Sequence, residues 1–94
     1  MIKGKTESGF NFKIDEATFN DMELLELLVD ADNGNYLAIS KVLDIILGQD
    51  QKKKLYDHVR NDNGRVQIDL VTNEVKEILT LSGTKAKNSS TSPM

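Results

Sequence analysis

The sequence contains no cysteine and no tryptophan, and only one histidine and one proline occur among its 94 residues. Because cysteine is absent, the protein can form neither disulfide bonds nor a zinc site built on thiolates. Its longest uncharged apolar run is far too short to cross a bilayer, and its first residues lack the apolar segment of a signal peptide. We therefore expect a soluble cytosolic protein that makes no contact with a membrane.

The residues that carry most enzyme and metal chemistry are also scarce. His58 is the only histidine, and no cysteine is present to share a metal with it. Residues 30–35 resemble the opening of a calcium loop, but Asn35 and Lys41 stand where that motif needs glycine and glutamate. Most serines lie near the C-terminus, and no glycine-rich phosphate loop opens a helix. We expect no enzymatic activity, no metal and no cofactor.

Acidic and basic residues are distributed unevenly along the chain. Residues 1–50 contain ten acidic and four basic residues, whereas residues 51–94 contain five acidic and eight basic residues. The net charge of −3 therefore combines an acidic first half with a basic second half. Two interpretations remain open: the halves are two differently solvated surfaces, or the acidic end of one copy meets the basic end of the next in a head-to-tail homo-oligomer.

The most apolar stretch, residues 36–47, is the one around which the rest of the chain is organised. On a helix its large apolar residues form one broad face: Tyr36, Ile39, Val42, Leu43, Ile46 and Leu47. Three further apolar residues fall outside that face: Leu37, Ala38 and Ile45. Few positions are left that suit contact with water, so we predict a central helix, closed by Gly48, with other helices or a partner around it.

Residues 1–14 predict a β-hairpin, because Phe10, Phe12 and Ile14 alternate with polar residues and residues 7–9 supply a turn. A helix is predicted over residues 21–32, capped by Asn20 and broken by Gly34. Its apolar arc covers more than half the circumference and consists of Leu24, Leu25, Leu27, Leu28 and Ala31. Its solvent-facing stripe is acidic and consists of Glu23, Glu26 and Asp30.

A third helix, over residues 50–61, has few apolar residues and ends at Gly64. A fourth helix follows a brief extended segment, is capped by Asp69 or Thr72, and ends before Gly83. Residues 84–94 hold no large apolar residue before Met94 and are predicted to be disordered. The predicted fold is mainly α (α+β), with about four helices around the central one, an N-terminal hairpin over residues 1–14 and a single domain over residues 1–83.

The two most apolar helices carry more apolar surface than one core requires. Leu37 and Ile45 lie outside the main face of the central helix, and Leu27 lies at the margin of the arc on the helix before it. Two explanations compete: neighbouring elements wrap far enough to bury these residues, or they are left for another copy or a client protein. Because the third helix has few apolar residues, we favour the second and predict all three as partner-binding residues. The acidic stripe is the next candidate surface.

The strongest basic run is Lys52, Lys53 and Lys54, which could contact phosphate groups. No aromatic residue interleaves these lysines, only Arg60 could share their helix face, and the chain is acidic overall. We interpret the run as a solvated helix face and do not expect nucleic-acid binding.

Several short stretches occur in a particular order along the chain. They are DMELLELL at residues 21–28, Leu47-Gly48 with Gln51, DNGRV at residues 62–66, Glu77-Ile78 and KNSSTSP at residues 87–93. This order resembles that of tail assembly chaperones of long-tailed phages and prophages of Gram-positive bacteria. The resemblance spans most of the chain.

The resemblance implies a non-enzymatic protein that binds the tape-measure protein, keeps that long apolar helical chain soluble and helps recruit tail-tube subunits. It also implies that the protein works in the host cytoplasm and is absent from the mature virion. Two alternatives from other classes remain: a small phage or plasmid DNA-binding regulator, and a structural subunit of the tail.

Overall fold

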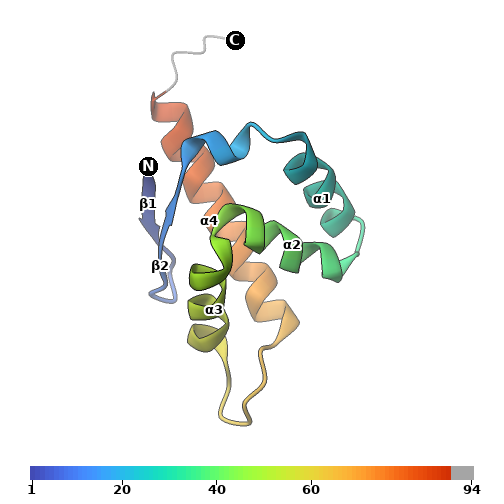
Figure 1. Ribbon diagram of the computed structural model, residues 1–94. Coiled ribbons are helices and arrows are strands. Elements are labelled where there is room, and N and C mark those ends of the chain that lie inside the picture. Colours follow the sequence, from blue (N-terminus) through green and yellow to red (C-terminus); the bar gives the residue numbers. More distant parts are fainter. Residues whose placement is uncertain (90–94) are drawn as a thin grey trace.

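The computed structural model describes the backbone over residues 1–89 and the side chains over residues 1–83. Its elements are β1 (Ile2–Lys5), β2 (Asn11–Ile14), the 3-10 helix η1 (Glu16–Phe19), α1 (Met22–Asp32), α2 (Tyr36–Ile46), α3 (Gly48–Val59) and α4 (Ile68–Ser89). Figure 1 shows the hairpin at one side of the molecule and α1 at the other, with α2 and α4 between them. The predicted class, a mainly α fold of four helices with a small N-terminal hairpin, is confirmed.

The hairpin pairs β1 with β2 in antiparallel register, with Ile2 opposite Ile14 and Gly4 opposite Phe12. Strand alternation turns one side of each strand to the core, so Ile2, Phe12 and Ile14 are buried while the lysines between them are exposed. A Cβ at Gly4 would lie 2.5 Å from Cζ of the buried Phe12 ring, so a larger residue there would force the ring to shift. The hairpin prediction is confirmed.

Helix α1 begins one residue later than its capping pattern indicated. Asp21, not Asn20, is the N-cap: its extended backbone lets its carboxylate accept hydrogen bonds from the amides of Glu23 and Leu24. Asn20 instead ends η1, a short helix that the sequence did not predict. The predicted break after α1 is confirmed, since Gly34 has a φ of 97°.

Helix α2 is the centre of the fold, because it contacts η1, α1, α3 and α4. Its buried residues are Ala38, Ile39, Val42, Leu43 and Ile46. The predicted face was wrong at two positions: Tyr36 is exposed, and Ala38 is buried. Packing of helices on several sides extends burial beyond one face to Ala38, whereas Tyr36, the first residue of α2, remains open to water. Gly48, with a φ of 77°, then turns the chain directly into α3.

Helix α4 contributes Val71, Val75 and Ile78 to the core. The predicted caps were wrong: α4 begins at Ile68, and the Thr72 hydroxyl donates to the Ile68 carbonyl from within the helix. The predicted end before Gly83 was also wrong, since the helical backbone continues to Ser89. Residues 84–89 of the tail predicted to be disordered are thus the last turns of α4, and residues 90–94 lie outside the described part. The single domain over residues 1–83 stays a prediction.

Candidate partner-binding surfaces

An apolar groove of about 260 Å³ lies where the first turn of α2 meets the start of α4. Tyr36, Leu37 and Ile68 stand at it with 59%, 80% and 60% of their surface exposed. Its remaining lining residues are Ile39, Ser40, Tyr56, Val66, Val71 and Thr72. We call this hollow the α2–α4 groove. Large apolar side chains held open to water in a concave surface are typical of a site that another molecule covers.

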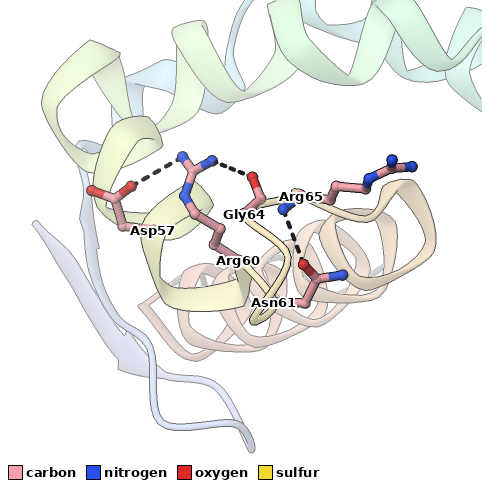
Figure 2. Close-up of polar contacts among 5 residues, drawn as sticks. All are labelled: Asp57, Arg60, Asn61, Gly64 and Arg65. Carbon is pink, nitrogen blue, oxygen red and sulfur yellow. Dashed lines mark hydrogen bonds and ion pairs between the residues drawn. The ribbon is translucent and has the colours of Figure 1, made fainter.

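The turn between α3 and α4 shapes the neighbouring surface (Figure 2). The Arg60 guanidinium donates to the Gly64 carbonyl at 3.0 Å and to the Asp57 carboxylate at 3.1 Å, while the Arg65 amide donates to Asn61 Oδ1 at 3.0 Å. In Figure 2 the Arg65 side chain points away from this cluster, and it has no polar partner among the residues with described side chains. A wider, more polar hollow of about 730 Å³, lined in part by Arg65 and Lys76, adjoins the groove through Tyr36 and Ile68.

The three residues predicted to bind a partner do not form one surface. Leu37 lines the α2–α4 groove and is almost fully exposed. Leu27 and Ile45 are partly buried and pack against the core. Neighbouring elements cover part of each of these two side chains, and partner binding by Leu27 and Ile45 stays a prediction. The candidate surface retains Leu37 alone from that set.

The outer side of α1 is a second exposed surface. Met22, Leu25 and Val29 are 67%, 53% and 52% exposed and are spaced by three and four residues, so they form one row along the helix. The acidic stripe of Glu23, Glu26 and Asp30 is fully on the surface and runs parallel to this row, one residue further along. Leu25 was assigned to the inner apolar arc, and the roles of Met22 and Val29 were missed.

A polar cluster joins the hairpin turn to α3 and α4. Ser8 Oγ donates to Glu74 Oε2 at 2.9 Å and lies 3.0 Å from His58 Nε2. A serine hydroxyl has one proton, so Ser8 donates in only one of these two contacts, and the direction of the contact with His58 depends on the histidine tautomer. The cluster connects the hairpin turn to α3 and α4, and no sequence pattern indicated that Ser8 and His58 would meet.

The basic run on α3 is partly neutralised within the domain. The Lys52 ammonium donates to Ser40 Oγ at 2.8 Å and to the Asp44 carboxylate at 3.1 Å, and it lies 5.7 Å from the centre of the Tyr56 ring. Arg60 pairs with Asp57. Lys53 and Lys54 remain exposed. Two of the cations considered as phosphate contacts thus face acceptors of the same chain.

Within the described residues, no group of histidine, aspartate and glutamate side chains is placed to hold a metal ion. No described helix combines the length and the apolar composition that a membrane span needs. Comparisons with protein-family models, with curated proteins and with solved structures found no match to this chain.

Sequence reasoning missed Tyr36 and Ile68 as groove residues for different reasons. Tyr36 shares the helical face of Ile39 and Leu43, so its spacing alone assigned it to the core. Ile68 stands at helical spacing from Val71 and Val75, which predicts a helix but does not show which of its apolar residues are exposed. Both residues stand in the first turn of a helix. Each is the first residue of its helix, where fewer segments surround a side chain, and this position was the signal in the sequence.

Proposed function

We propose that this chain is a tail assembly chaperone of a long-tailed phage or prophage, and that it holds an apolar helical segment of the tape-measure protein in the α2–α4 groove. In this role it keeps the client soluble in the host cytoplasm, helps recruit tail-tube subunits and leaves before the virion is complete. It performs no chemical step. The observation that carries the proposal is the exposure of Tyr36, Leu37 and Ile68 around one apolar groove.

Apolar surface left open to water costs free energy that a bound client would recover. A large apolar side chain forgoes about 1.5–3 kcal/mol of burial free energy when it is fully exposed, and three such side chains, 59–80% exposed, converge on the same hollow. Lining residues such as Val71 and Tyr56 give the groove an apolar floor. An amphipathic helix laid along such a groove buries its own apolar face and that of the groove together. A long apolar helical client supplies this kind of segment.

The test is co-purification of the tape-measure protein from the same phage with a tagged form of this chain. Leu37→Ser and Ile68→Ser should each lower the recovered tape-measure protein by about tenfold, while the melting temperature stays close to wild type. Leu70→Ser is the matched control, because Leu70 is an exposed leucine of α4 that does not line the groove. Equal recovery with all three variants would contradict the proposal.

Two further measurements separate this role from the alternatives. A salt-dependent gel shift with duplex DNA would indicate a DNA-binding regulator, since phosphate contacts weaken steeply with salt. Detection of the chain in purified virions would indicate a structural tail subunit. The proposal expects neither result.

A further inference from the structure

We infer that α1 is a second docking element, and that its partner is a cationic amphipathic helix: a segment with an apolar row flanked by lysine or arginine. The inference rests on the proposed function in one respect, since the helix is taken to belong to the same client. It concerns a different surface from the α2–α4 groove and states the charge that this client segment must carry.

The outer row of α1 does not take part in the hydrophobic core of the protein. Leu24 is buried, and Leu27, Leu28 and Ala31 pack against the core from the inner side of the helix. Met22, Leu25 and Val29 are more than half exposed on the other side. Because these residues are three and four positions apart, they form a straight ridge of about two turns, which is the surface that helix-on-helix packing uses.

The charge of α1 selects the partner. No basic residue occurs within α1, and none of its acidic residues forms an ion pair with a described side chain. Glu23, Glu26 and Asp30 therefore line one flank of the apolar ridge with negative charge that nothing in the described chain neutralises. A partner helix whose apolar row is flanked by lysine or arginine covers the ridge and, at the same time, forms ion pairs with these carboxylates.

A second copy meeting α1 through the same ridge does not fit this pattern. A two-fold symmetric contact places each patch against its own copy. Because α1 holds no basic residue, the acidic stripe of one copy would meet no cation on the α1 of the other, and in an antiparallel pair the two stripes would lie side by side and repel. A cationic helix of a different chain meets the same ridge without that repulsion.

Two labelled model peptides test the inference with the full-length protein. Each has about 18 residues, or five helical turns, with leucine on one face and either lysine or glutamate on the other. Fluorescence anisotropy should show the lysine peptide binding at least about tenfold more tightly than the glutamate peptide, with a preference that shrinks as salt is raised. Equal affinity for the two peptides, or no binding of either, would overturn the inference.

Variants locate the peptide on α1. Leu25→Ser combined with Val29→Ser should weaken binding of the lysine peptide by about tenfold. Glu26→Lys combined with Asp30→Lys should reverse the preference toward the glutamate peptide, an outcome that misfolding cannot produce. Asp62→Lys is the control, because Asp62 is an exposed acid in the turn before α4 and should leave the preference unchanged.

The two proposals fail in different ways. Leu37→Ser in the groove should leave binding of the lysine peptide unchanged while it lowers recovery of the tape-measure protein. If the wild-type chain prefers the lysine peptide but does not recover the tape-measure protein, the proposed function fails and the α1 inference stands. If the double serine variant dissociates an oligomer in light scattering and binds the lysine peptide as well as wild type does, the ridge is an interface between copies and the inference is overturned.

Discussion

Thr6 Oγ1 donates a hydrogen bond to Glu74 Oε1 at 2.8 Å, although the two residues are 68 positions apart in the chain. Ser8 donates to the other carboxylate oxygen of Glu74, so both oxygens of a side chain that is only 7% exposed are satisfied by the hairpin turn. A buried carboxylate without such donors is strongly unfavourable. This pair therefore fixes where the hairpin sits on α4, and α4 in turn forms one wall of the α2–α4 groove.

Removing the Thr6 hydroxyl should destabilise the protein. Thr6→Val keeps the volume but deprives Glu74 of a donor and the Phe10 amide of its acceptor, so we expect a loss of about 1–3 kcal/mol in urea unfolding. Thr6→Ser retains the hydroxyl and loses only a methyl group, which should cost about 1 kcal/mol or less. Equal losses for the two variants would show that the hydrogen bonds at Thr6 contribute little.

The Gln51 side chain connects α3 to the outer edge of β2 by hydrogen bonds. Its amide accepts from the Lys13 N–H and donates to the Lys13 and Leu47 carbonyls, each at 2.8 to 2.9 Å. Gln51→Glu replaces the donor by an oxygen that repels both carbonyls, and we expect a loss of about 1–3 kcal/mol in thermal unfolding. Gln49→Glu is the control, since Gln49 is exposed and should change stability by less than about 0.5 kcal/mol. Similar effects at both glutamines would contradict this role.

Two glycine-to-alanine substitutions should change the stability of the protein in opposite directions. Gly4→Ala would place its Cβ against the buried Phe12 ring, so we expect a loss of about 1–3 kcal/mol. Gly83 lies within α4, and a Cβ there meets no atom within 4 Å, so Gly83→Ala should raise stability by about 0.5–1 kcal/mol. Denaturant unfolding of both variants is the measurement. A destabilising Gly83→Ala would mean that α4 does not continue through this position in solution.

Charged substitutions on α2 should separate surface from core. Leu37→Glu is expected to change the free energy of unfolding by less than about 0.5 kcal/mol, because Leu37 is 80% exposed. Ile45→Glu should cost about 1–3 kcal/mol, because it forces a carboxylate among side chains that pack on the core. Thermal unfolding of both variants, followed by circular dichroism, measures these two effects. If Ile45→Glu melts like wild type, Ile45 belongs to the open surface after all.

Part of the candidate site could be predicted from the sequence and part could not. Leu37 was identified as surplus apolar surface because it lies outside the main face of its helix, and it is exposed in the groove. Ile45 met the same criterion and is partly buried. The difference depends on which neighbours reach each side of α2. Helical spacing describes the direction of a side chain but not what lies opposite it.

The sequence by itself determined the local structure: the strand alternation at Phe10, Phe12 and Ile14, the helical periods, and the chain reversals at Gly34 and Gly64, whose φ angles are 97° and 82°. These features depend on residues close together in the chain, so a sequence pattern contains them. Only the tertiary structure decided that Ala38 is buried while Tyr36 is exposed, and that Ser8, His58 and Glu74 meet. Those outcomes depend on how distant elements pack, because burial and long-range hydrogen bonds form between segments whose relative positions no local pattern specifies.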